Sequence, residues 1–153
     1  MFKQLPVLLV LAALLLTACN SKGCYDDMSV KVYCVFYSDS TKKAVSVDSV
    51  TVKGVGSDSI IYDNETLSQL ELDLNSNATE TKYVIQTVSN SDVFTDTLTL
   101  QHTNKPWFQS MECGCMVFST LTGCTTNGDI FKSVTIEDKN VTNIETEHVI
   151  LYL

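Results

Sequence analysis

Apolar and polar side chains alternate along most of the chain after residue 28, and this period of two limits the possible folds most strongly. Successive side chains of a β-strand point to opposite faces, so the pattern predicts strands with one buried face and one face toward solvent. The alternating apolar residues fall into five groups: Val30, Val32, Cys34 and Phe36; Leu70, Leu72 and Leu74; Leu98 and Leu100; Ile130, Val134 and Ile136; Val149, Leu151 and Leu153. The chain is therefore predicted to be all-β, with Cys34 facing inward.

Turn-forming residues separate the alternating segments and set the number of strands. They lie at residues 39–42, 54–58, 75–77, 89–92, 104–106 and 127–129, and no segment carries a convincing helical stripe. This spacing predicts a single antiparallel β-sandwich, immunoglobulin-like, of about eight or nine strands. It occupies residues 29–153. Val45 and Val47 lie on one parity and Val50 and Val52 on the other, which predicts a β-bulge near Asp48-Ser49.

The N-terminus carries a short apolar run that ends in a cysteine. Lys3 precedes the run, and Leu16-Thr17-Ala18-Cys19 closes it. The 14 residues from Leu5 to Ala18 are too few for a transmembrane helix, which needs roughly 20. The order resembles a bacterial lipoprotein signal with its lipobox. The resemblance implies that residues 1–18 are cleaved as a signal peptide, that Cys19 is acylated, and that residues 19–28 form a polar tether.

Two other interpretations of this segment remain open, a transmembrane anchor and an ordinary cleaved signal in which Cys19 stands by chance. The residue after Cys19 is Asn20 rather than Asp. By resemblance to the enteric sorting rule, this favours transport to the outer membrane, with the membrane face left open. The predicted partner is a membrane, to which the protein is attached through lipid on Cys19. This lipid consists of diacylglycerol and an amide-linked chain such as palmitate.

Charge limits the kinds of partner that the domain can bind. The ten lysines and eighteen acidic residues give a net charge of −8, and the chain contains no arginine. Loss of Lys3 with the signal peptide makes the mature chain one unit more negative. Nucleic acids and anionic headgroups are recognised by clustered basic residues, so neither is an expected partner. An envelope protein or a glycan remains possible.

The five cysteines other than Cys19 predict disulfides, as expected for an exported protein. Cys113 and Cys115 lie about 6.6 Å apart on one face of a strand, near the limit for bridging each other. The preferred bridge joins Cys24 to Cys113, and a second joins Cys34 to Cys124 or Cys115. The Cys-Gly-Cys spacing does not match the Cys pairs of zinc sites. No metal and no cofactor are therefore expected.

Residue types that carry catalysis are scarce. His102 and His148 are the only histidines, and no serine lies in a Gly-x-Ser-x-Gly elbow. A catalytic histidine needs a nucleophile beside it, so both histidines are expected to be surface or cross-strand residues. The acidic turns lack the Asp-x-Asp-x-Asp spacing of a calcium loop. The chain is accordingly predicted not to be an enzyme, with no catalytic residues.

Trp107 and Phe108 form the only concentrated aromatic pair. Two interpretations are open: an exposed tip that binds a sugar or another partner, or a plug over the end of the hydrophobic core. The first would make the protein a ligand-binding module, with glycan as a candidate ligand.

The mature chain resembles a family of small Bacteroidetes-type outer-membrane lipoproteins whose domain has no assigned function. The residues that carry the resemblance are Cys24, Ser110-Met111-Glu112-Cys113-Gly114, Ile130, Val134 and Ile136, and Glu147-His148-Val149-Ile150-Leu151-Tyr152. It implies an exported β-rich domain and supplies no catalytic residues. We therefore expect a membrane-anchored, non-enzymatic envelope protein with a structural or interaction role. The alternative is a ligand-binding module presented at the outer membrane.

Overall fold

The computed structural model describes residues 29–111 and 113–153. The predicted signal peptide, Cys19, Cys24 and the tether lie outside the described residues. Within them the chain forms ten strands and no helix: β1 (Val32–Tyr37), β2 (Val47–Gly54), β3 (Ile60–Leu67), β4 (Gln69–Leu72), β5 (Glu80–Ser89), β6 (Asp92–Ser110), β7 (Gly114–Thr125), β8 (Ser133–Ile136), β9 (Asn140–Val141) and β10 (Val149–Tyr152). The all-β prediction is confirmed.

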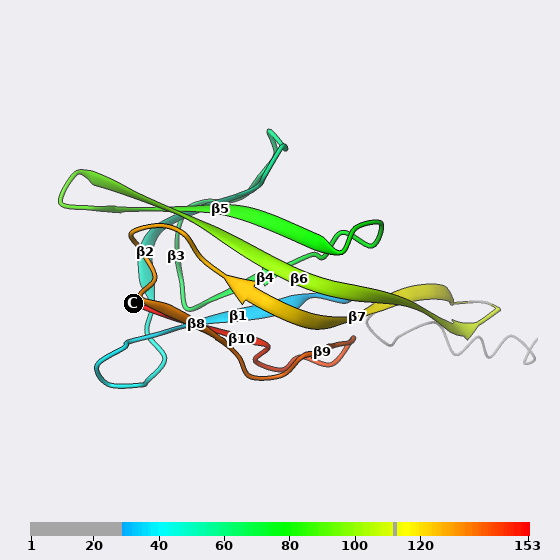
Figure 1. The fold of residues 1–153 in the computed structure, drawn as a ribbon. Helices are drawn as coiled ribbons and strands as arrows, with labels where there is room; N and C mark the ends of the chain where they lie inside the picture. Colours follow the sequence, from blue (N-terminus) through cyan, green and yellow to red (C-terminus); the bar gives the residue numbers. More distant parts are fainter. Residues whose placement is uncertain (1–28, 112) are drawn as a thin grey trace, which may run out of the picture.

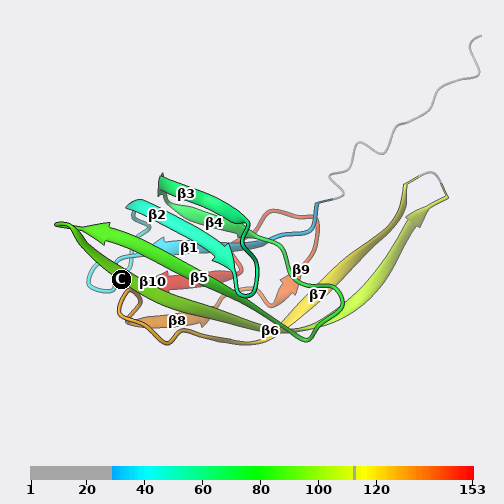
Figure 2. The same cartoon turned by 90° about the horizontal axis from the view of Figure 1, so that it is seen from above.

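The strands form two sheets that pack face to face (Figures 1 and 2). One sheet has the order β4-β1-β10-β8 and the other has the order β3-β2-β5-β6-β7-β9. Strands β5, β6 and β7 form a continuous antiparallel meander, so the larger sheet is built mostly from neighbours in sequence. The predicted β-sandwich is therefore confirmed, with ten strands in the described residues rather than the eight or nine expected. One pair departs from the predicted antiparallel arrangement, because β1 runs parallel to β10.

The core lies between the sheets and is built from the residues that alternate in the sequence. Its fully buried side chains include Val32, Phe36, Leu70, Leu98 and Leu151. Cys34 is also fully buried, as its parity predicts. Burying a large aliphatic side chain contributes roughly 1.5–3 kcal/mol, so this inward-facing set supplies much of the stability of the domain.

The predicted bulge is present in β2. The pairing of β2 with β3 shifts between Val47 and Val50, and Ser49 has a φ of 55°. The extra residue reverses the parity of the strand, so that Val50 and Val52 both enter the core. The local sequence pattern was sufficient to place this irregularity.

The turn predicted at residues 104–106 is wrong, because β6 runs without a break from Asp92 to Ser110. The last pair between β5 and β6 is Glu80 with Gln101, so β6 has only β7 beside it at Pro106. A proline is tolerated in a strand where one backbone edge has no partner. Pro106 therefore lies opposite Val117 in a continuing hairpin.

A buried carboxylate fixes the loop between β7 and β8. Asp96 on β6 is 1% exposed, and its two oxygens accept backbone N–H groups of Asn127 (3.0 Å) and Phe131 (3.2 Å). Gly128 packs so closely against β6 that an added Cβ would be 2.3 Å from the Thr95 carbonyl oxygen. The loop is thus held tightly against β6, with Phe131 buried.

Candidate functional site

The far end of the β6–β7 hairpin extends beyond both sheets (Figures 1 and 2). We call residues 104–111 and 113–119, which include the ends of β6 and β7, the arm. Seven to eight residues of extended strand span roughly 25 Å. The ladder is continuous along the arm, from Asn104 opposite Ser119 to Ser110 opposite Gly114, with one irregularity after Phe108. The arm is therefore a structured projection.

Three large apolar side chains of the arm are exposed, whereas Met116 is buried. The exposed fractions are 49% for Trp107, 58% for Phe108 and 91% for Met111. The interpretation of Trp107 and Phe108 as a plug over the core is therefore wrong. The reason is the unbroken course of β6, which carries both residues past the end of the sandwich.

Apolar side chains lie on both faces of the arm, with Lys105 on the same face as Trp107. Trp107 lies opposite Met116, and its ring stacks on Phe118 with a centroid distance of 5.5 Å. On the other face, Phe108 lies opposite Cys115 and Pro106 opposite Val117. The Trp107–Phe118 stack stiffens the arm and leaves about half of the indole surface open.

A polar network fixes the base of the arm. Nδ1–H of His102 and the Ser119 hydroxyl both donate to Oδ1 of Asn104, each at 2.8 Å. Nδ2 of Asn104 donates to the carbonyls of Asn75 (3.1 Å) and Ala78 (2.7 Å). With Nδ1 protonated, Nε2 of His102 accepts from the Thr81 hydroxyl at 2.8 Å. The network is fully paired and ties the arm to the 75–78 turn.

Within this network the Thr81 hydroxyl is directed at Nε2 of His102, and it also accepts the Asn75 backbone N–H at 3.0 Å, so it helps to hold the 75–78 turn. The Ser119 hydroxyl is directed at Asn104 rather than at His102, and His102 is 1% exposed. The expectation of a cross-strand histidine is confirmed, while that of a surface position is wrong for His102. Within the described residues there is no cluster of three or more histidine, cysteine, aspartate or glutamate side chains placed to hold a metal ion.

His148 is also buried and also structural, so a surface position is wrong here too. Its Nδ1 accepts the backbone N–H of Tyr33 at 3.1 Å, and Nε2–H donates to the carbonyl of Asn140 at 3.2 Å. The ring stacks on Tyr33 with a centroid distance of 5.9 Å. Burial lowers the pKa of His148 below its usual value, despite the opposing effects of the Asn140 carbonyl and the nearby Asp138.

We expect His148 to make the domain sensitive to mild acid. Its pKa is lower in the folded than in the unfolded chain, so the unfolded chain takes up the proton first. The contribution of His148 to the free energy of unfolding is complete above the unfolded pKa of about 6.5. It is lost as the pH falls from there through the lower pKa of the folded state. Protonation also removes the acceptor of the Tyr33 N–H. Urea unfolding at pH about 7.5 and about 5.5 should show a larger loss of stability in the wild type than in His148→Gln. Equal losses would contradict this role.

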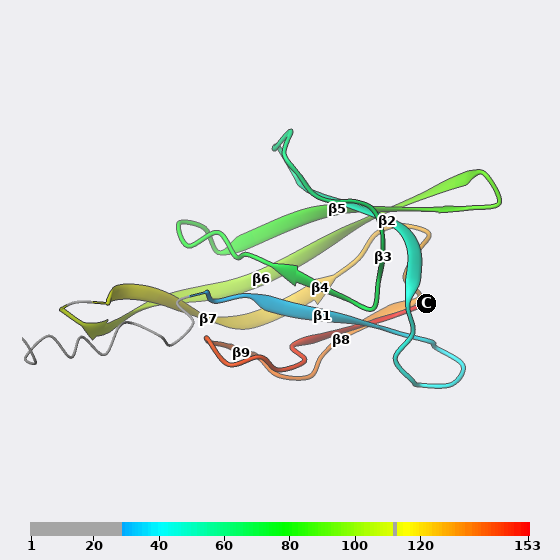
Figure 3. The same ribbon diagram turned by 180° about the vertical axis from the view of Figure 1, so that it is seen from behind.

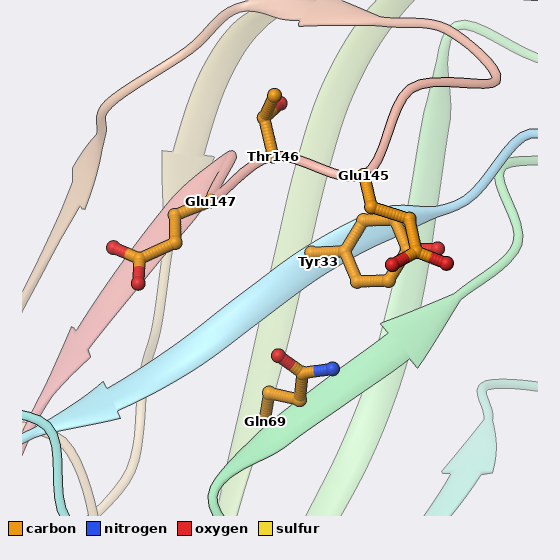
Figure 4. Close-up of a pocket in the computed structure, with 5 residues that line it drawn as sticks. All are labelled: Tyr33, Gln69, Glu145, Thr146 and Glu147. Carbon is orange, nitrogen blue, oxygen red and sulfur yellow. The ribbon is translucent and has the colours of Figure 1, made fainter.

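A shallow pocket lies on the outer face of the smaller sheet (Figure 4). Tyr33 of β1 and Gln69 of β4 form its floor, and Glu145, Thr146 and Glu147 come from the segment before β10. The hydroxyl of Tyr37 donates to the Glu147 carboxylate at 3.1 Å, which raises the pKa of Tyr37. The pocket offers an aromatic ring, an amide and two carboxylates, groups that bind polar ligands by hydrogen bonds.

The cysteines only partly follow the predicted pairing. Cys34, Cys115 and Cys124 are free thiols, so the second bridge, from Cys34 to Cys124 or Cys115, is wrong. Cys34 belongs to the smaller sheet and Cys124 to the larger one. The two side chains lie near each other, since Cys124 contributes to the raised pKa of Cys34, but their sulfur atoms are not bonded. Cys115 lies on the exposed arm, away from Cys34.

Of the three free thiols, Cys34 and Cys124 are unreactive and Cys115 lies exposed on the arm. Burial, with a smaller contribution from Cys124, holds the pKa of Cys34 well above its usual value, and burial raises that of Cys124 to about 12. Neither is a thiolate at neutral pH. Cys113 is disulfide-bonded, and its predicted partner Cys24 lies outside the described residues, so the pairing with Cys24 stays a prediction.

The fold and the arm define an all-β sandwich domain with an apolar hairpin projecting from one end. The chain belongs to the family of unknown function DUF6452, which it matches over residues 49–153. No curated protein and no solved structure matches the chain. The family match agrees with the expectation of a domain without an assigned function.

Proposed function

We propose that this protein is an exported lipoprotein with a non-enzymatic structural or interaction role at the outer membrane. Cleavage removes residues 1–18, Cys19 receives the lipid, and residues 19–28 link the anchor to the β-sandwich. The observation that carries this proposal is the order of Lys3, the apolar run and Leu16-Thr17-Ala18-Cys19 directly before an all-β domain. The resemblance to Bacteroidetes-type lipoproteins also supports it. In the described residues no helix is long and apolar enough to cross a membrane.

The hydrogen bonds of the two histidines support a role without catalysis. His102 is paired with Thr81 and Asn104, and His148 with Tyr33 and Asn140. Both rings are buried, and the Thr81 hydroxyl at His102 also accepts the Asn75 backbone N–H, so these contacts fit a structural role. The exposed arm instead supplies the kind of apolar surface that marks an interaction site.

Membrane fractionation of cells that express the full chain tests the anchor. We expect the protein in the outer-membrane fraction, resistant to high salt and to carbonate and released by detergent. A lipid anchor gives this behaviour because its attachment does not depend on charge. Release by salt alone, or recovery in the soluble fraction, would contradict the proposal.

A second candidate function is glycan binding, favoured by the exposure of Trp107 and Phe108. Open aromatic faces stack on apolar faces of sugars, and the pocket beside Tyr33 and Gln69 offers hydrogen-bonding groups. The folded domain should then bind oligosaccharides on a glycan array. Trp107→Ala should lose this binding, and Phe94→Ala, an exposed aromatic on the opposite hairpin, should retain it. Equal binding by both variants would contradict a role for the arm aromatics.

A further inference from the structure

The geometry points to a second membrane contact, in which the tip of the arm inserts into the lipid–water interface of the bilayer that holds Cys19. The tip of the arm contacts a lipid bilayer whose headgroups are uncharged or zwitterionic. This inference rests on the proposed lipid anchor. It adds a surface of the folded domain that contacts the membrane and fixes the orientation of the sandwich.

The side chains at the tip are those that favour a membrane interface. Trp107 and Phe108 are adjacent and exposed, and Met111 at the turn is almost completely exposed. Tryptophan is enriched at bilayer interfaces because its ring is apolar while its N–H can still bond to water or headgroups. A hairpin is suited to this depth, since the backbone of the tip remains near water.

The distribution of charge also favours this end of the molecule. Residues 97–128 contain a single lysine, Lys105, and a single acidic residue, Glu112. The other acidic residues lie outside this segment, so the arm is nearly neutral in a strongly acidic chain. A neutral apolar tip enters an interface without the cost of desolvating charges. It also avoids the repulsion that an acidic surface meets at anionic headgroups.

The described chain starts at the same end of the sandwich as the arm. Strand β1 begins at the end of the sandwich from which the arm projects (Figures 1 and 3). At this end Tyr33 contacts His148, and Asn104 at the base of the arm bonds the 75–78 turn that follows β4. Only residues 20–28 separate Cys19 from Ser29, which makes ten steps along the chain. Ten extended residues reach at most about 33–36 Å, so the anchored domain stands close to the bilayer.

The predicted Cys24–Cys113 bridge would shorten the distance between the tip of the arm and the lipid on Cys19. Cys113 is disulfide-bonded and lies in the connection at the tip of the arm. Cys24 is five residues from Cys19. Five residues span at most about 17 Å, so this bridge would hold the tip next to the lipid.

Trp107 is the only tryptophan of the chain, so its fluorescence reports on the arm alone. The experiment uses the acylated full-length mature protein in phosphatidylcholine vesicles and in vesicles of the same lipid with brominated acyl chains. We expect emission at shorter wavelength than in the unacylated protein in solution, and loss of most of the emission in brominated vesicles. Phe108→Ser/Met111→Ser should remain with the vesicles but show much weaker quenching by bromine.

The opposite hairpin provides a matched control. Val93 and Phe94 near the β5–β6 turn are also exposed, but they lie at the other end of β6 (Figure 1). Val93→Ser/Phe94→Ser should be quenched like the wild type. Both double variants change exposed side chains only, so neither is expected to unfold the domain.

The possible outcomes distinguish membrane contact through the arm from attachment through the lipid anchor. If the protein sediments with vesicles while Trp107 escapes bromine and remains accessible to aqueous iodide, the arm does not touch the bilayer and the inference is overturned. Protection of Trp107 that grows with protein concentration in the absence of lipid would instead assign the arm to a second copy and also overturn it. Failure of the protein to sediment contradicts the lipid anchor. In that case bromine quenching at excess vesicles still decides whether the arm inserts.

Discussion

Replacing Cys19 with alanine is expected to move the mature protein from the membrane fraction to the soluble fraction. Each buried CH₂ group of an acyl chain contributes about 0.8 kcal/mol, and a single chain alone binds only marginally. Three chains on Cys19 would make attachment effectively permanent, and the variant carries none. Contact through the tip of the arm is far weaker and is not expected to survive a carbonate wash.

Processing must be kept equal in this experiment. The variant should be exported with an ordinary cleavable signal so that both mature chains begin at residue 19. Cys24→Ala is the matched control, because it removes a neighbouring cysteine of the tether and leaves the acylated residue. It should remain in the membrane fraction. Sedimentation of Cys19→Ala after a carbonate wash would contradict the anchor.

Replacing Asp96 with alanine is expected to destabilise the domain by about 2–4 kcal/mol, because two backbone N–H groups lose a charged acceptor in a buried site. The groups concerned belong to Asn127 and Phe131. Phe131 is part of the core, so loosening of this loop exposes apolar surface as well. Such a loss is a large fraction of the total stability of a small domain. Urea unfolding followed by circular dichroism measures it.

Asp92→Ala is the control for Asp96, because Asp92 is an exposed carboxylate on the same strand. Its replacement should change the midpoint of unfolding only slightly. Gly128→Ala should destabilise independently, since its Cβ would collide with the backbone of Thr95 and Asp96. A midpoint for Asp96→Ala equal to that of Asp92→Ala would show that the loop does not depend on the carboxylate.

The sequence was sufficient to predict which face of each strand points inward and where β2 has its bulge, because both follow from the parity of neighbouring residues. The parallel pair of β1 with β10 joins residues more than 100 positions apart, as with Cys34 and Val149. No local pattern specifies such a pairing. The sequence also suggested a turn at residues 104–106, where the structure has a continuous strand. Turn-forming residues alone did not reveal that β6 has a free edge there.

The candidate site was predicted only in part. The sequence singled out Trp107 and Phe108 but left open whether they are exposed, since exposure depends on how far β6 extends beyond β5. Asp96 was missed, although a signal was available. It shares the parity of Leu98 and Leu100, and a carboxylate on an inward-facing position must find buried donors.

The lipid anchor is tested most directly by the mass of the mature protein extracted from membranes, followed by mass spectrometry of its N-terminal peptide. We expect a chain that begins at Cys19 and carries a diacylglycerol and an amide-linked acyl chain. A chain that retains residues 1–18, or one that carries an unmodified Cys19, would contradict it.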